Sequence, residues 1–263
     1  MKFDELDKKM RVFETNSDHC VLPGMQIIAR LDGRNFTTLT KKNEQFDAPF
    51  DERFRDLMVD TTKYLMQNTG FNVIYGYTES DEISLLLSPD TKEFGRKTRK
   101  LNSILSGEAS AIFTKNYGDV GVFDCRISEL PTTNNVVDYF RWRNEDAHRN
   151  SLSGWVYWTA RKSGMSVSKA TAFMKNMLDT GKNEYLFQKG INYNELPSWQ
   201  KRGIGLYWQT AEKYAYNQYE KKQVKSLRNI LFVNYELPMK QEYSEFLEDI
   251  LRKNRYEERI NAQ

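Results

Sequence analysis

The chain has 263 residues and a formal net charge of +3, so its length allows one large domain or two small ones. Hydrophobic residues make up 39% of it, which is enough for a packed core, and its mean hydropathy is −0.73. No apolar run approaches the roughly 18 residues of a membrane helix, and the N-terminus is too charged for a signal peptide. We therefore expect a cytoplasmic protein with no membrane partner, whose two cysteines are reduced thiols.

The first part of the chain predicts a strand, a helix and a hairpin, in that order. The apolar segment 25–31 predicts a buried strand. Residues 51–68 carry apolar side chains at helical spacing, with Asp51 in the N-cap position. Two further strands are predicted over 73–77 and 83–87, joined by a short turn.

A second amphipathic helix is predicted near 98–117, and a fourth strand over 120–127. The order strand, helix, strand, strand, helix, strand is typical of a ferredoxin-like fold with an antiparallel sheet. Polymerases and nucleotide cyclases use the same order in their palm domains. We therefore predict an α+β fold in which residues 1–134 form a palm-like catalytic core.

The rest of the chain, 135–263, is expected to be a mainly helical extension that completes the same catalytic unit, or to form one single domain with it. Its predicted elements are helices near 135–146, 151–163 and 166–179, a strand near 203–209, a further apolar segment over 230–233, and a charged amphipathic helix over 240–258.

Two acidic residues stand at strand ends in this pattern: Asp32 after the first strand and Asp81 at the hairpin tip. Mg²⁺ prefers carboxylate and carbonyl oxygens, and two such ions can clamp the attacking and leaving oxygens of a phosphoryl transfer. The pattern therefore predicts two Mg²⁺ ions near Asp32 and Asp81, with the carbonyl of Gly33 free to approach them. The alternative is that each acid is an ordinary turn or cap residue.

The segment after Asp32 favours a phosphate site. Because Gly33 lacks a side chain, the amides that follow it can turn toward a phosphate. We expect the backbone from Gly33 to Thr37 and the Thr37 hydroxyl to hold a nucleoside triphosphate. Glu82 follows Asp81 but alternates to the opposite face of the strand, so among the candidate catalytic residues it is expected to have a positioning role.

Five cations lie close together around the start of the second helix: Lys92, Arg96, Lys97, Arg99 and Lys100. Cations at a helix N-terminus oppose the helix macrodipole. Binding of a polyanion, such as a triphosphate or an RNA 5′ end, explains this placement. A solvated basic face is the alternative.

A third cluster, residues 141–151, mixes guanidinium, aromatic, imidazole and amide groups, which suits RNA ends and phosphates. It contains His148, for which a purely structural role is the alternative. The segment Lys182-Asn183-Glu184 follows Gly181 and by composition alone is an ordinary turn.

Together these segments resemble the tRNA-histidine guanylyltransferase superfamily, the 3′–5′ polymerases. The matching stretches are RLDGRNF (30–36), YTESDEISLLL (77–87), residues 96–100, YFRWRNEDAHRNSL (139–152), GKNEYLFQKGINYNELP (181–197) and KRGIGLYW (201–208). The resemblance implies a polymerase-like palm, two Mg²⁺ ions, ATP or GTP, a tRNA substrate and a homotetramer.

The resemblance also implies roles for individual residues. Asp32, Gly33 and Asp81 match the metal ligands of the family, and Asp51 matches a residue near the incoming base. The nucleotide- and phosphate-binding residues implied by the family motifs are Asp32, Gly33, Arg34, Asn35, Phe36, Thr37, Asp51, Ser80, Lys97, Lys100, His148, Asn150, Lys182 and Asn183.

One departure from the family is informative. Eukaryotic members carry HINNLYN where residues 148–154 here read HRNSLSG. The change resembles the bacterial and archaeal branch, which is associated with template-directed repair of tRNAs missing 5′ nucleotides. The resemblance therefore implies template-dependent 3′–5′ addition to tRNA 5′ ends, after adenylylation or guanylylation of the end. Guanosine addition to tRNA-histidine, a nucleotide cyclase and a non-catalytic RNA-binding protein are the alternatives.

Overall fold

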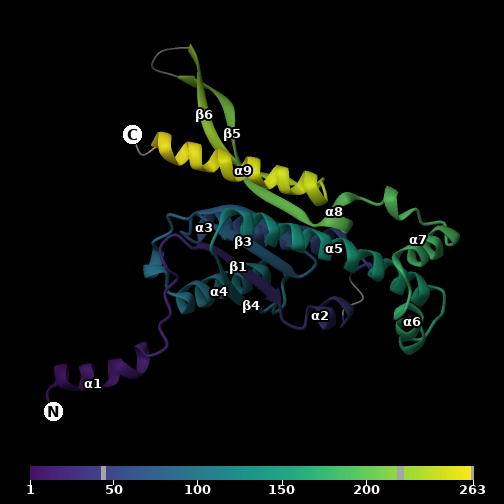
Figure 1. Ribbon diagram of the computed structural model, residues 1–263, viewed down its shortest axis with the longest axis horizontal. Helices are drawn as coiled ribbons and strands as arrows, with labels where there is room; N and C mark the ends of the chain where they lie inside the picture. Colours follow the sequence, from purple (N-terminus) through teal and green to yellow (C-terminus); the bar gives the residue numbers. More distant parts are fainter. Residues whose placement is uncertain (43–45, 218–221, 262–263) are drawn as a thin grey trace.

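The computed structural model describes residues 1–42, 46–217 and 222–261 (Figure 1). A six-stranded antiparallel sheet with the order β4-β1-β3-β2-β5-β6 lies at its centre. The strands are β1 (Gln26–Gly33), β2 (Val73–Glu79), β3 (Glu82–Leu87), β4 (Phe123–Leu130), β5 (Ile204–Asn217) and β6 (Lys222–Asn234). The helices are α1 (Phe3–Thr15), α2 (Phe36–Lys42), α3 (Glu52–Asn68), α4 (Thr98–Tyr117), α5 (Thr133–Lys162), α6 (Val167–Met174), α7 (Asp179–Gln188), α8 (Ser198–Arg202) and α9 (Lys240–Asn261).

The predicted α+β fold is confirmed. The elements β1, α3, β2, β3, α4 and β4 follow one another along the chain, and their strands lie in the order β4-β1-β3-β2. This is the ferredoxin-like arrangement. The fourth strand begins at Phe123, three residues later than predicted, because the amides of Gly121 and Phe123 bond to hydroxyls of α4 rather than to a strand.

Helices cover both faces of the sheet. On one face α3 and α4 pack on a core that contains Ile27, Ala29 and Leu31 of β1. On the other face α5 and α9 pack on a second core that contains Ile28. Only Ile27, Ile28 and Ala29 of β1 form a continuous apolar run, and from Ala29 on apolar and charged residues alternate, with Arg30 and Asp32 on the face of Ile28.

The second half of the chain differs from the prediction in two ways. Residues 133–162 form one helix, α5, instead of two helices, because the polar segment between them contains no Gly or Pro and packs Ala147 and Ser151 inward. The predicted strand 203–209 and the apolar segment 230–233 belong to a much longer hairpin, β5–β6, and β5 pairs with β2. The sheet therefore runs across the predicted boundary at residue 134, and the division into two parts stays a prediction.

The remaining helices form a small side unit beyond one end of the sheet. Helices α6 to α8 pack against the second half of α5 around the buried side chains of Leu152, Val156, Leu186 and Tyr193. At the other end of the molecule α1, which the sequence did not predict, lies apart from the sheet and buries no side chain (Figure 1). None of the helices in the described part of the chain has the length and hydropathy needed to cross a lipid bilayer.

Asp51 caps α3, as predicted. Its carboxylate accepts hydrogen bonds from the amide of Arg53 at 2.8 Å and from the amide of Asp47 at 2.7 Å. The hydrogen bond from the Arg53 guanidinium, together with these amides, lowers the pKa of Asp51 to about 2. The cap thus anchors both the helix and the segment that precedes it.

Asp51→Ala should lower the free energy of unfolding by about 1 kcal/mol, because α3 loses its N-cap. A carboxyl with a lowered pKa stabilises the fold above its unfolded pKa of about 3.8, and this contribution is lost as the pH falls toward about 2. Urea denaturation of wild type and variant should therefore show a full difference at neutral pH that shrinks below about pH 4. Asp60→Ala, which removes an exposed carboxylate from the same helix, is the control. A difference that stays constant down to about pH 2 would contradict the assignment.

Candidate active site

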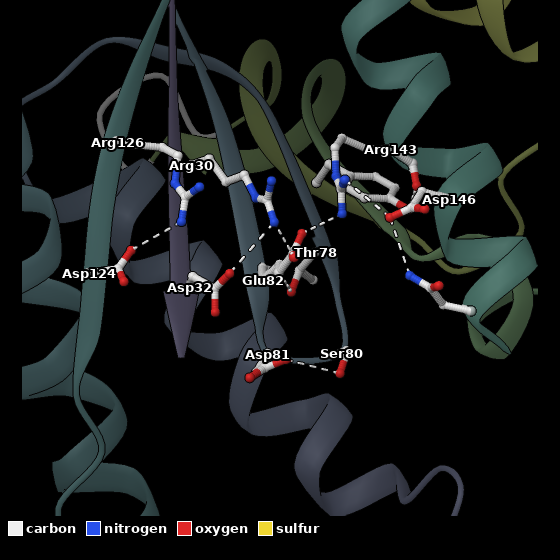
Figure 2. Close-up of polar contacts among 12 residues, drawn as sticks. Arg30, Asp32, Thr78, Ser80, Asp81, Glu82, Asp124, Arg126, Arg143 and Asp146 are labelled. Atoms are coloured by element: carbon white, nitrogen blue, oxygen red, sulfur yellow. Dashed lines mark hydrogen bonds and ion pairs between the residues drawn. The ribbon is translucent and has the colours of Figure 1, made fainter. Parts of the chain in front are cut away.

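The structure brings Asp32 and Asp81 together at one end of the sheet, where β1 ends and β3 begins (Figure 2). Asp32 is the residue before the end of β1, and Asp81 forms the tip of the β2–β3 hairpin with Ser80. The amide of Gly33 donates to the carbonyl of Asp81 across 3.0 Å, which holds the hairpin tip beside the end of β1. The three predicted metal ligands are therefore neighbours.

The electrostatics of this pair suit a cation. Burial and the nearby Asp32 carboxylate raise the pKa of Asp81, although the Ser80 hydroxyl donates to it at 3.1 Å. The nearest guanidinium nitrogen to Asp32, on Arg30, is 3.6 Å away. Two carboxylates that face each other repel, and oxygen donors of this kind are those that Mg²⁺ takes.

A metal at this end of the sheet would need ligands beyond side chains. Within the described residues, no group of three or more His, Cys, Asp or Glu side chains is arranged to hold a metal ion. Mg²⁺ is commonly held by one or two carboxylates together with water and the phosphates of a substrate. Asp32, Asp81 and the Gly33 carbonyl fit that mode of binding, in which the nucleotide completes the site.

Glu82 is held by two arginines. Arg143 of α5 donates to Oε2 of Glu82 at 2.5 Å, and Arg30 of β1 donates to Oε1. Arg143 is only 4% exposed and also pairs with Asp146 at 3.2 Å (Figure 2). Both carboxylate oxygens of Glu82 thus bind guanidinium groups. This arrangement is consistent with a positioning role, which stays a prediction.

Glu79 is a site residue that the sequence reasoning missed. It ends β2 and lies opposite Glu82 in the register of the hairpin. Burial, followed by the negative charges of Glu82, Asp146 and Asp81, raises the pKa of Glu79 to about 8. Glu79 therefore keeps its proton at neutral pH, which reduces the charge that the acidic cluster must carry.

Fewer backbone amides of the predicted phosphate-binding segment are available than expected. The amide of Gly33 is used by Asp81, and the amide of Arg34 donates to the carbonyl of Val122 at 2.8 Å. The amides of residues 35–37, at the start of α2, remain as candidates for phosphate binding, and this role stays a prediction. The side chain of Phe36 is buried in the core, and a Cβ at Gly33 would lie 2.6 Å from its ring. Gly33 is thus required for Phe36 to pack where it does.

A cavity of about 760 Å³ opens beside the hairpin tip. Its lining includes five predicted site residues: Phe36, Thr37, Asp51, Ser80 and Asp81. Its size is that of a typical small-molecule site, which could hold a nucleotide. Sequence reasoning missed the other chemically notable lining residues, because they come from separate segments: Phe46, Phe50, Arg55, Trp158, Arg161 and Trp199.

The basic cluster lies elsewhere. Arg96 is buried and donates to five main-chain carbonyls, one of them that of Met25, just before β1. Lys97 pairs with Asp18 at 2.8 Å. Asp32 is at the other end of β1, which is about 23 Å from Met25 at a rise of roughly 3.3 Å per residue. Within one chain, Lys97 and Lys100 are therefore not near the candidate carboxylates, and their contact with phosphates stays a prediction.

His148 and Asn150 lie on α5. Burial, followed by the charges of Arg202 and Lys201, lowers the pKa of His148, so its ring is neutral at physiological pH. Asn150 donates to Asp146 at 3.2 Å, and Asp146 in turn pairs with Arg143. Asn150 is in this way connected to Glu82 through Asp146 and Arg143.

Lys182 and Asn183 lie within α7, so the expectation of an ordinary turn at Gly181 is wrong. The helix begins at Asp179 and continues through the glycine because Leu186 and other apolar residues pack against α5. Lys182 is buried and donates to the hydroxyl of Ser153 at 3.1 Å and to Asp179 at 3.0 Å. Sequence analysis therefore identified Lys182 and Asn183 as candidates but did not predict that they lie in a helix.

Glu79→Gln tests the protonated state of Glu79. A carboxyl with a raised pKa stabilises the fold below its unfolded pKa of about 4.5, and this contribution is lost as the pH rises through about 8. Wild type should therefore lose stability relative to Glu79→Gln across this range in denaturation experiments. Glu52→Gln, at an exposed carboxyl, should show no such trend. A parallel pH profile for wild type and Glu79→Gln would refute the assignment.

Comparison with known proteins identifies the family of this chain. Residues 7–131 match the family model for tRNAHis guanylyltransferase (Thg1), and residues 134–250 match that for the Thg1 C terminal domain. A tRNA(His) guanylyltransferase from Candida glabrata is 31% identical over 209 residues, which span 73% of this chain and 86% of that protein. A probable tRNA(His) guanylyltransferase from Drosophila melanogaster is 30% identical over 199 residues, spanning 72% and 69%.

Solved structures give the same result. A bacterial tRNA(His) guanylyltransferase (Thg1)-like protein in complex with ATP has 30% identity and a TM-score of 0.73, covering 93% of this chain and 98% of that one. A structure of the same description in complex with GTP has 28% identity and a TM-score of 0.71, covering 94% and 99%. This chain therefore belongs to the tRNA(His) guanylyltransferase family, a family of nucleotidyltransferases.

Proposed function

We propose that this enzyme adds nucleotides to the 5′ end of tRNA in the 3′–5′ direction, with the opposite strand as template. The observation that carries the proposal is the meeting of Asp32 and Asp81 beside the 760 Å³ cavity. A carboxylate pair next to a space for a nucleotide is what nucleotidyl transfer requires. The names of the relatives support tRNA as the substrate, and their ATP and GTP complexes support both nucleotides as ligands.

The residues divide the work as follows. Asp32, Asp81 and the Gly33 carbonyl would hold two Mg²⁺ ions, and Glu82 would position the strand ends through Arg30 and Arg143. The bound ions lower the pKa of the attacking hydroxyl and neutralise charge on the leaving phosphate. The amides at the start of α2, with Thr37, hold the triphosphate.

The cavity selects and orients the nucleotide. Its aromatic residues, such as Phe50 and Trp158, give a base an apolar surface, and Arg161 supplies a cation for a phosphate. Asp51 lies at the same wall and is held ionised by Arg53. Both oxygens of its carboxylate already accept hydrogen bonds from Asp47 and Arg53, so the expected contact of Asp51 with the incoming base stays a prediction.

Two transfers follow. In the first, a 5′-phosphate oxygen of the tRNA attacks the α-phosphate of ATP or GTP, and pyrophosphate leaves. In the second, the 3′-hydroxyl of an incoming nucleoside triphosphate attacks the activated 5′-phosphate, and AMP or GMP leaves. A 5′-triphosphorylated RNA skips the first transfer, with pyrophosphate as the leaving group of the second. Both transfers need positioning and charge stabilisation rather than a side-chain nucleophile.

The choice of template-dependent addition rests on residues 148–154. Ser153 replaces the tyrosine of eukaryotic members and accepts a hydrogen bond from Lys182. Gly154 lies beside Pro49, at the cavity. Because both residues are small, this segment offers no large side chain that could recognise one particular tRNA. Base pairing with the opposite strand therefore selects the nucleotide. Guanosine addition to tRNA-histidine, the activity in the names of the relatives, is the second candidate.

Asp32→Asn and Asp81→Asn should each reduce activation and nucleotide addition by about a thousandfold or more, since both transfers use the same carboxylates. The fold should persist, because removing one of two facing carboxylates relieves repulsion. Single-turnover assays with labelled tRNA and Mg²⁺ measure both steps. Asp124→Asn is the matched control, because Asp124 lies opposite Asp32 on β4 and is exposed. Wild-type rates in either active-site variant would exclude the proposed metal site.

A pair of tRNAs that lack the first nucleotide and differ only in the opposing base tests template dependence. Each is offered all four nucleoside triphosphates, and the products are mapped. We expect C opposite G, G opposite C, and slow reaction with a full-length tRNA-histidine that has A opposite the new position. Guanosine added whatever the opposing base would favour the second candidate. A cyclic product from ATP or GTP without RNA would indicate a cyclase.

A further inference from the structure

Helix α1 presents an apolar stripe that none of the residues in the described part of the chain covers. It has no buried residue and lies apart from the sheet (Figure 1). The stripe consists of Phe3, Leu6, Met10 and Phe13, which are 78%, 44%, 51% and 73% exposed. Four large apolar side chains on one helix face, all in water, mark an interaction surface.

The spacing of the stripe identifies the kind of partner. Its residues are separated by three, four and three positions, which is the a-d-a-d spacing of a helix that pairs with another helix. Val12 is equally exposed, at 62%, but falls outside this spacing. The stripe is thus the narrow seam of a coiled-coil contact rather than a broad apolar face.

The charges beside the seam identify the partner itself. With Phe3 and Met10 at a positions, Lys2 and Lys9 occupy g positions, and the e positions are acidic. In a parallel pair of identical helices, each g residue faces the e residue five positions later in the other helix. Lys2 then faces Asp7 and Lys9 faces Glu14, so that every flanking pair has opposite charges.

We propose that α1 pairs in parallel with α1 of a second copy of this chain. In an antiparallel pair the g positions face each other and so do the e positions, which would place lysine against lysine and acid against acid. Asp7 also bonds Arg11 within its own helix at 2.7 Å, but both groups are exposed and such pairs are weak. Asp7 thus remains available to the partner helix.

The pairing depends on the whole chain. At 13 residues α1 is too short to form a stable coiled coil by itself. Other contacts between two copies would raise the local concentration of the two helices and make the pairing favourable. The inference does not rest on the proposed catalytic function, and it is tested with the full-length protein.

Disulfide cross-linking tests the parallel register. In a parallel pair identical seam residues lie side by side, within the distance a disulfide spans. Met10→Cys in a Cys20→Ser background should give a cross-linked dimer under mild oxidation, and Val12→Cys should give several times less. Cys125 can stay, because burial raises the pKa of its thiol to about 12. Neither substitution disturbs the core, since α1 buries no side chain.

Charge reversal tests the partner assignment. Adding Lys9→Glu to Met10→Cys should lower the cross-linked fraction, and adding Glu14→Lys as well should restore it. Equal cross-linking at positions 10 and 12, or none at position 10, would overturn the proposal. Cross-linking only between mixed Leu6→Cys and Met10→Cys chains would show an antiparallel pair and would overturn it too. Docking of α1 on the body of another copy would leave the double charge reversal without rescue.

Discussion

The antiparallel register of β1 and β3 places Asp32 opposite Glu82, and the next amide along β1, that of Gly33, donates to the Asp81 carbonyl. Because side chains alternate along a strand, a slip of one residue would turn Asp32 into the core beneath α3 and α4. Such a slip is opposed because it would bury Arg30 and Asp32 where Ile27, Ala29 and Leu31 now pack. The position of the candidate carboxylates is thus determined by the hydrophobic core next to them.

The concentration of acids at this end of the sheet requires compensation even without a metal. Glu82 binds two guanidinium groups, and one of them, on Arg143, is almost fully buried. A buried charge that loses its partner is strongly destabilising, so Arg143 and Glu82 hold each other in place. The proton on Glu79 removes a further negative charge. Asp32 lies 3.6 Å from the Arg30 guanidinium, which also binds Glu82, so one cation is shared between two carboxylates. The pair Asp32 and Asp81 is the one assigned to the metals.

Much of the fold could be predicted from the sequence, because the first half follows simple periodicities. The strand and helix patterns of residues 25–127 gave the ferredoxin-like order, and Asp32 and Asp81 followed from strand ends. The cavity could not be predicted, since its walls come from five separate segments. The structural role of Arg96 could not be predicted for a different reason. Its buried hydrogen bonds go to main-chain carbonyls, which every residue has, so no residue type in the sequence indicates them. The polar residues inside α5 led to the prediction of two helices, because a local sequence pattern does not show that α7 and α8 pack against this helix.

The pairing of β5 with β2 has a consequence for how the chain folds during synthesis. β2 has buried side chains along almost its whole length, yet its outer edge is covered only by residues 204–207. Until these residues leave the ribosome, the nascent palm exposes an unpaired strand edge next to apolar side chains, which is a template for aggregation. The β5–β6 hairpin, which is synthesised late, therefore completes a sheet whose other strands are synthesised early. A truncated chain that ends before β5 should need a chaperone even though its ferredoxin-like unit is complete.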